Sequence, residues 1–266
     1  MKTCRLELWA LLFVSAFFPA VTQAQSVFRP YLGLAPTSYS ISFDNNAPPG
    51  YAGKTAKSNY VAGNLGLTWI SPKGIYVDLS GQLSGPNATH DLWQDSTVSQ
   101  PQDFTHDSYT LTGGYSHGFE SGASVSGFGG YTYEKTTLAA PRGATVPSSA
   151  GPLVINFSKD TFESSGIFIG AGGGYPALAG QFSGSVAVAG MKGTWKDDNG
   201  FNNSATTTVG FSLGGAYTYP ITQSLGITAD LRFQQYKYDF GAANTPTAYT
   251  VTEKITSLGV KLGYRF

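Results

Sequence analysis

Apolar and polar residues alternate with a period of two along most of the chain. The last ten residues, SLGVKLGYRF, are the clearest example. They place one set on a single face: Leu258, Val260, Leu262, Tyr264 and Phe266. Successive side chains of a strand point to opposite faces, whereas a helix repeats about every 3.6 residues. The pattern therefore predicts strands and not helices.

The same alternation recurs in ten segments. They are 28–43, 58–70, 74–84, 106–119, 122–137, 164–176, 182–196, 206–219, 224–238 and 254–266. Strands of roughly 10 to 15 residues exceed the usual ~5 to 6 and are long enough to cross a bilayer when tilted. In the first segment the apolar residues change face near Pro36, which predicts a β-bulge there. They pass from Leu32 and Leu34 to Tyr39, Ile41 and Phe43.

The connections between these segments alternate between short and long. Short turns lie at 71–73, 120–121, 177–181 and 220–223, and long polar connections at 44–57, 85–105, 138–163, 197–205 and 239–253. This order predicts an all-β, antiparallel, up-and-down meander of ten strands with both ends on the short-turn side. Eight or twelve strands remain as alternatives, if the first segment breaks at Pro36 or the region 138–163 forms strands.

Aromatic residues collect near both ends of the predicted strands. Near the short turns lie Trp69, Tyr115, Phe119, Tyr175, Phe182, Tyr217, Tyr219 and Phe266. Near the long connections lie Tyr39, Phe43, Tyr60, Tyr109, Tyr131, Tyr133, Trp195 and Tyr238. Amphipathic rings favour the two interfaces of a membrane, so these sets predict two aromatic belts. They favour a membrane-spanning barrel, with its apolar face toward lipid, over a soluble sandwich.

The amino-acid composition indicates that the protein is surrounded by something other than water alone. Charged residues make up 12% of the chain, against about 25% in ordinary soluble domains, while there are 34 glycines and 14% aromatic residues. This does not suit a soluble enzyme or a disordered chain. The formal net charge is zero, so nothing indicates a nucleic-acid partner.

The N-terminus has the order of a secretory signal peptide. Lys2 and Arg5 precede an apolar stretch, and small residues precede a predicted cleavage site after Ala24. We therefore expect a cleaved signal peptide at 1–24 and a barrel domain at 25–266. Cys4, the only cysteine, falls in the removed part, so the mature chain has no disulfide and no thiol ligand.

These features together resemble the bacterial outer-membrane β-barrel proteins, among them small porin-like and opacity-like barrels. The resemblance covers nearly all of 26–266 and includes the end Tyr264-Arg265-Phe266. It implies a location in the outer membrane of a Gram-negative bacterium, with short turns in the periplasm and long loops outside. It also implies that Tyr264 and Phe266 act as an assembly signal for the barrel-insertion machinery, with outer-membrane lipid and lipopolysaccharide as partners. No subfamily is indicated.

The polar face of the predicted barrel carries few charged residues. They are Asp78, Asp230, Arg232, Lys261 and Arg265. Asp230 is predicted to pair with Lys261 or Arg232 inside the barrel, with Arg265 at its mouth. These charges either fill a narrow barrel as ion pairs or form the constriction of a pore.

An enzymatic role finds little support in the sequence. The predicted loops hold His90, Asp91, His106, Asp107, Asp197 and Asp198. Ten-stranded outer-membrane proteases carry acidic pairs and an Asp/His pair facing across the barrel mouth. Here both loop histidines lie in or beside 85–105, and 197–205 offers only carboxylates, so no catalytic residues, metal site or cofactor are predicted.

The sequence therefore predicts a non-enzymatic outer-membrane protein. It is either a small pore for small solutes or a surface structural protein. The alternative is an adhesin or receptor that binds an extracellular ligand through the long loops at 85–105 and 138–163.

Overall fold

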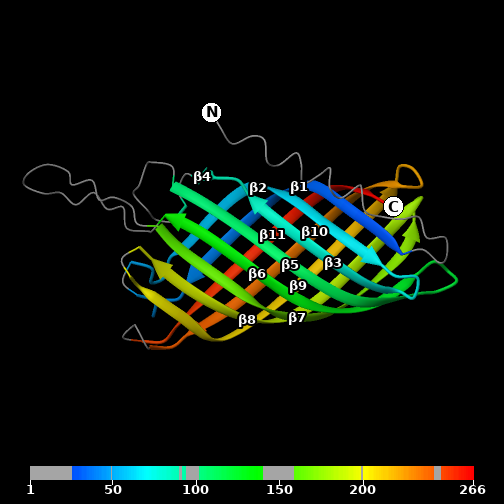
Figure 1. The fold of residues 1–266 in the computed structure, drawn as a ribbon. Helices are drawn as coiled ribbons and strands as arrows, with labels where there is room; N and C mark the ends of the chain where they lie inside the picture. Colours follow the sequence, from blue (N-terminus) through cyan, green and yellow to red (C-terminus); the bar gives the residue numbers. More distant parts are fainter. Residues whose placement is uncertain are drawn as a thin grey trace, which may run out of the picture.

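The chain folds into a closed antiparallel β-barrel of tilted strands (Figure 1). The computed structural model describes residues 26–48, 50–89, 92–93, 102–139, 159–198, 200–242 and 247–266. Its strands are β1 (Val27–Phe43), β2 (Thr55–Ile70), β3 (Ile75–Ser84), β4 (Asn87–Thr89), β5 (Gln102–Gly118), β6 (Ser124–Ala139), β7 (Lys159–Ala177), β8 (Gly180–Asp197), β9 (Asn202–Pro220), β10 (Leu225–Phe240) and β11 (Tyr249–Tyr264). The predicted signal peptide lies outside the described residues.

The barrel closes at two seams. β1 pairs with β11, so that the first and last strands are neighbours, and β3 pairs directly with β5. The short strand β4 continues beyond β3 along the same edge of β5. In the short-turn half, closure leaves no open sheet edge, which a chain in lipid requires because no water is available to unpaired backbone groups. The predicted all-β barrel of ten long strands is confirmed, with β4 as a short addition on β5. Within the described part of the chain, no helix is long and apolar enough to span a bilayer.

A belt of apolar side chains surrounds the outside of the barrel on its short-turn half. Leu32 and Ile167 are 67% and 70% exposed, and neighbouring strands contribute outward residues of the same kind. The full set of exposed aliphatic residues on the strands is Leu32, Leu34, Val61, Leu65, Leu67, Ile75, Val77, Leu79, Leu111, Val125, Ile167, Ile169, Val186, Val188, Val209, Leu213, Ile227, Leu231, Leu258, Val260 and Leu262. A continuous apolar surface of this extent is the lipid-facing surface of a membrane barrel.

Between this belt and the long loops, the apolar residues lie on the inside of the barrel instead of the outside. On β1, Leu32 and Leu34 point outward, whereas Tyr39, Ile41 and Phe43 are buried within. The pairing of β1 with β2 nevertheless runs without a shift from Val27 to Ser42. The bulge predicted near Pro36 is therefore wrong. The strand keeps its phase, and it is the surroundings that change, from lipid to water.

A bulge does occur in β9. Its register against β10 shifts between Asp239 and Phe240, and its register against β8 shifts between Gly190 and Thr194. Both shifts fall near the long-loop end, outside the belt. The bulge therefore does not disturb the lipid-facing pattern of β9.

The aromatic belt near the short turns is present, but the second belt is largely absent. Tyr115, Tyr175 and Phe266 are exposed at the short-turn end as predicted. At the far side of the belt, Tyr109 and Tyr131 are exposed outward. Five other residues assigned to that second belt are instead buried inside: Tyr39, Phe43, Tyr60, Trp195 and Tyr238.

The C-terminus is fixed at the short-turn end (Figure 1). The backbone N–H of Phe266 donates a hydrogen bond to the carbonyl of Phe28 at 3.0 Å, and that of Arg265 donates to Ser224 at 2.7 Å. The rings of Tyr264 and Phe266 meet edge to face at 4.8 Å while both stay exposed. The last residues thus join β1 to the end of β11 without burying the phenyl ring.

We predict that deletion of Phe266 reduces assembly far more than its small buried area suggests. The physical reason is the loss of a recognisable terminal ring and of the hydrogen bond to Phe28. The measurement is the yield of heat-modifiable barrel in outer membranes. Phe119→Ala, which removes another exposed ring at the same end, is the control. Equal yields from the two variants would contradict the assembly role.

Candidate functional site

The long-loop half of the barrel interior is a packed aromatic core. Its members come from eight strands and two connecting segments: Tyr39, Ile41, Phe43, Tyr51, Ala56, Tyr60, Trp93, Phe104, Leu138, Phe162, Trp195, Tyr236, Tyr238, Phe240, Tyr249, Val251 and Ile255. We call this set the aromatic core. Several of its side chains, including Ile41, Trp93 and Tyr238, are completely buried.

Contacts within the aromatic core cross the barrel axis. Phe43 on β1 meets Trp195 on β8 edge to face, with ring centroids 4.9 Å apart. Phe162 on β7 meets Tyr238 on β10 at 4.8 Å. Neither pair of strands is adjacent in the sheet, so these rings span the interior. The interior at this level is filled by side chains.

Connecting segments also fold onto the aromatic core. The indole N–H of Trp93 donates to the carbonyl of Ala139 at 2.7 Å, and Trp93 and Leu92 are fully buried. Tyr51 packs against Phe43 and donates from its hydroxyl to Asp160 at 2.7 Å. Residues from outside the strands therefore close the long-loop end of the aromatic core.

Besides Asp160, two buried carboxyl groups lie in the aromatic core, beyond the lipid-facing belt. Tyr236 donates to Glu134 at 3.3 Å and Tyr238 donates to Glu253 at 3.0 Å. Burial raises the pKa of both carboxyl groups, and the neighbouring charge of Glu253 raises the pKa of Glu134 further. Both groups therefore favour the neutral acid, which the low-polarity core tolerates.

Among the residues considered for catalysis, those that the structure describes are not brought together. His106 is packed between the rings of Tyr39 and Tyr60, and its Nδ1 lies 2.9 Å from the Thr136 hydroxyl. Burial lowers its pKa to about 4, so the ring is neutral and out of contact with water. Asp107 points to the opposite face and accepts the backbone N–H of Ser84.

The remaining candidates lie elsewhere. Asp197 and Asp198 accept backbone N–H groups of Phe201 and Lys159 near the long-loop end. His90 and Asp91 lie outside the described residues. No group of three or more His, Cys, Asp or Glu side chains that could hold a metal ion occurs in the described ranges.

The short-turn half of the interior is different, because it holds a polar cavity of about 550 Å³. We call it the polar cup. The charged side chains that line it are Arg29, Asp78, Asp230, Arg232 and Lys261. Four of the five residues predicted for the lumen thus share one cavity. Arg265 follows the end of β11 and is exposed, outside the lining of the cup.

The two carboxylates of the polar cup already have partners. Asp78 accepts hydrogen bonds from the hydroxyls of Thr68 at 2.6 Å and Tyr31 at 3.4 Å. Asp230 forms an ion pair with Lys261 at 3.1 Å, which is the pairing predicted from sequence. The Lys261 ammonium also lies 5.6 Å from the centre of the Tyr31 ring.

Sequence reasoning missed several inward polar residues. Arg29 and Tyr31 share the inward phase of β1, opposite to Leu32, so the alternation itself could have identified them. Glu134 continues the inward series of Ser124, Ser126 and Thr132 on β6. Glu253 fell within a predicted loop, because β11 begins earlier than expected.

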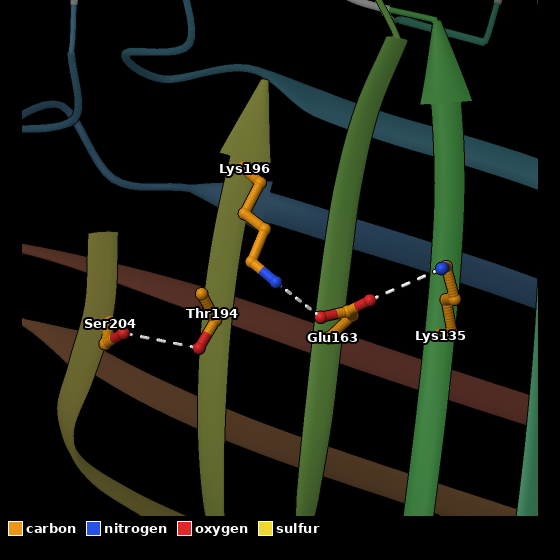
Figure 2. A network of polar contacts seen from close by, with 5 residues as sticks. All are labelled: Lys135, Glu163, Thr194, Lys196 and Ser204. Atoms are coloured by element: carbon orange, nitrogen blue, oxygen red, sulfur yellow. Dashed lines mark hydrogen bonds and ion pairs between the residues drawn. The ribbon is translucent and has the colours of Figure 1, made fainter. Parts of the chain in front are cut away.

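Lysine residues occupy the outer wall just beyond the lipid-facing belt. Those on outward positions of the strands are Lys57, Lys135, Lys159, Lys192, Lys196, Lys237 and Lys254. Figure 2 shows two of them, on β6 and β8, reaching one carboxylate on β7. Lys135 and Lys196 lie 3.3 Å and 2.8 Å from Glu163, and they hold the pKa of Glu163 below its usual range. We call these three residues the wall cluster.

Sequence comparison gives no relatives. No protein-family profile matches the chain, and no curated protein matches it.

The structure, in contrast, has clear likenesses. The outer-membrane protease OmpT of Escherichia coli has a TM-score of 0.64 at 13% identity, covering 94% of this chain and 99% of OmpT. The chain has the fold of a bacterial outer-membrane β-barrel. That fold and the lipid-facing belt fit a location in the outer membrane. At this identity the likeness extends to the fold alone.

Two further structures match more loosely. The translocator domain of the autotransporter NalP from Neisseria meningitidis has a TM-score of 0.47 at 13% identity, covering 98% of this chain and 95% of that one. Ail of Yersinia pestis has a TM-score of 0.37 at 13% identity, covering 91% and 99%. The barrel fold by itself leaves the role open.

We predict that the barrel loses stability as pH rises from about 5 through 8. A carboxyl group with a raised pKa binds more protons in the folded than in the unfolded state, so its stabilising effect is full below the ordinary value of 4.5 and declines as it ionises. In Glu253→Gln this pH dependence should be weaker. The free energy of unfolding should fall by on the order of 2 kcal/mol less than in the wild type over this pH interval. The measurement is urea unfolding in lipid or detergent at several pH values. Glu163→Gln, on the outer wall, should leave the slope unchanged; an equal slope in Glu253→Gln and the wild type would refute the assignment.

Proposed function

We propose that the protein is a non-conducting, non-enzymatic surface barrel of the outer membrane of a Gram-negative bacterium. It serves as a structural or receptor protein whose long-loop half stands above the membrane. The observation that carries this proposal is the aromatic core, whose rings meet across the barrel axis. Phe43 and Trp195 come from opposite parts of the wall and leave no room between them.

The alternative of a small open pore fits this geometry less well. A conducting barrel of this size needs a water-filled path along its axis. The polar cup offers such a path for only half of the length, and its lining residues include no member of the aromatic core. The charges of the cup therefore do not act as the constriction of a pore.

An enzymatic role is also disfavoured by the placement of the candidate residues. General acid–base catalysis requires a base within hydrogen-bond reach of its water or substrate. His106 is 1% exposed and its ring contacts tyrosines. A receptor role through 85–105 and 138–163 is part of this proposal; residues 90–91, 94–101 and 140–158 of these loops lie outside the described residues.

We predict that the wild-type barrel gives no discrete conductance steps in planar bilayers. The double variant Phe43→Ala, Trp195→Ala removes two rings that span the barrel axis. It should therefore show conductance steps or a leak current. Phe211→Ala removes a lipid-facing ring of β9 and is the matched control. Discrete wild-type channels that Phe43→Ala, Trp195→Ala leaves unaltered would overturn the proposal.

The wall cluster supports a second element of the proposal, which is binding of lipopolysaccharide phosphates. In an outer-membrane barrel the lysines beyond the belt lie on the extracellular side, next to the headgroup region. Two ammonium groups face one carboxylate in the wall cluster, which leaves a net positive charge (Figure 2). Lysine and phosphate pair as point charges.

We predict that the double variant Lys135→Gln, Lys196→Gln weakens binding of purified lipopolysaccharide by roughly threefold or more. Each exposed charge pair is worth up to about 1 kcal/mol, and two are removed. The measurement is retention of lipopolysaccharide on immobilised barrel at low ionic strength. Lys73→Gln, in a short turn at the other end, is the control. An equal effect of both variants would show general charge attraction and contradict a localised site.

A further inference from the structure

The polar cup is closed on one side and open on the other. Its lining reaches the short-turn rim, because it includes Ser124, the first residue of β6, and Gln181, the second residue of β8. Toward the long-loop end, the hydrogen bond from Tyr236 on β10 to Glu134 on β6 crosses the interior, and the aromatic core begins there. The cup is therefore blind toward the cell surface.

The charges of the cup are not balanced. Asp230 is taken up by Lys261, and Asp78 accepts from two neutral hydroxyls. Arg29 and Arg232 form no ion pair with any carboxylate in the described residues. Three cationic side chains of the lining thus face two carboxylates. Glu134, at the closed end of the cup, interacts electrostatically with Arg232, but burial raises its pKa and favours the neutral acid. The lining therefore has one excess positive charge.

The rest of the lining combines small neutral donors with the rings of Tyr76, Phe128 and Phe168. Hydroxyl groups come from Ser80, Thr110, Thr112, Ser126, Ser183 and Thr218. Opposite Asp230 lies Gly259, where an added Cβ would sit 2.5 Å from the Asp230 carboxylate. Glycine at that position leaves room for the ion pair at the wall of the cup and keeps its centre free.

This arrangement differs from what simple filling of a narrow barrel requires. Charges that only fill a narrow barrel are expected to pair with each other. Arg232, on the inward face of β10, lines the cavity, is itself exposed and forms no ion pair with the described residues there, so its guanidinium group is accessible to a solute in the cavity. A guanidinium group presents a planar set of donors that matches a carboxylate or a phosphate. A volume of about 550 Å³ lies within the range of small-molecule sites.

We propose that the polar cup is a binding site, open to the periplasm, for a small anionic solute bearing a carboxylate or phosphate group. Arg232 binds the anion, Arg29 adds positive charge nearer the short-turn rim, and the hydroxyl groups of the wall bind the polar substituents of the anion. The Asp230–Lys261 ion pair lies at the wall of the cup and leaves both arginines without a carboxylate partner among the described residues. This site goes beyond the proposed surface role, which concerns the opposite half of the barrel.

The test uses the full mature barrel folded in non-ionic detergent. Isothermal titration with inorganic phosphate and with succinate distinguishes phosphate from carboxylate recognition. Arg232→Gln should weaken binding by at least about tenfold, since it removes charge-assisted hydrogen bonds. Lys237→Gln, an outward lysine of the same strand, should bind like the wild type. Heat modifiability on gels confirms that each variant is folded.

A second measurement reports on the cup without depending on affinity. Because Cys4 is the only cysteine and precedes the described barrel, Ser80→Cys introduces a single reactive thiol into the cup. An anionic methanethiosulfonate should react faster with this thiol than a cationic one. Adding Arg232→Gln should reduce that preference about two- to threefold, because it removes one positive charge from the cavity that both residues line. The same reagents on Ser71→Cys, in a short turn, give the reference ratio.

The outcomes separate this proposal from the proposed function. Binding lost in Arg232→Gln but kept in Lys237→Gln, together with an anion preference of the Ser80→Cys thiol, would support the cup. Unchanged binding in Arg232→Gln, or no heat with either probe and no anion preference, would overturn it. Neither result depends on conductance, so a conducting wild-type barrel would remove the closed-barrel proposal and leave the cup to be judged by its own test.

Discussion

The backbone ladder of the closed barrel decides which side each residue faces, and the rest of the structure follows from that constraint. Each strand continues from a section surrounded by lipid to a section surrounded by water. On β1 the register against β2 is unbroken across this border, so no residue can change side. Apolar residues must therefore occupy outward positions where lipid is outside and inward positions where water is outside. The protein is a membrane barrel in one half and resembles a soluble barrel in the other.

This division produces the two compartments of the interior. Inward apolar residues bury each other in the water-surrounded half, where each buried ring contributes on the order of 1.5–3 kcal/mol. In the lipid-surrounded half, most apolar residues are outside, and the interior holds mainly polar side chains and glycine, with the rings of Phe128 and Phe168 among them. Small wall residues accommodate the large rings: a Cβ on Gly193 would meet the Tyr238 ring at 2.6 Å. The aromatic core and the polar cup thus arise from the same constraint and not from separate designs.

The alternation in the sequence was sufficient to predict the strands, their antiparallel order, the closed barrel and most of the lipid-facing residues. It was not sufficient for the long-loop half. In the first strand the shift of apolar residues was interpreted as a bulge, because a bulge and a change of solvent both move apolarity to the other face. The distinguishing signal was the series Ser38, Ser40 and Ser42, which continues the outward phase of Leu34 with polar residues.

Candidate site residues were predictable to the same extent. The pairing of Asp230 with Lys261 followed from their strand positions, because register depends on local geometry. The role of the buried Glu253 did not, since the strands were expected to end near the membrane surface. Which carboxylates lose contact with water depends on contacts across the barrel, such as that between β6 and β10. Such contacts leave no periodic signal along the chain.

On a single strand, the outward and the inward residues each show where the border between the two halves lies. Along β10 the outward residues change from Leu231 and Phe233 to Gln235 and Lys237. The inward residues of the same strand change next to that point, and they read Asp230, Arg232, Gln234, Tyr236 and Tyr238. The closing strand β11 repeats the coincidence, with Leu258 giving way to Thr256 outside and Ser257 to Ile255 inside.

These inside and outside changes are separate in principle, because a barrel could keep a polar lumen above the membrane. They coincide here within about one residue pair on both strands. A core that begins where lipid ends needs few additional apolar residues. Along each strand the apolar residues lie mainly on the outside in the lipid-surrounded half and on the inside in the water-surrounded half. The level of the membrane surface and the floor of the aromatic core are therefore a single boundary, and the depth of the polar cup is set by the thickness of the lipid-facing belt.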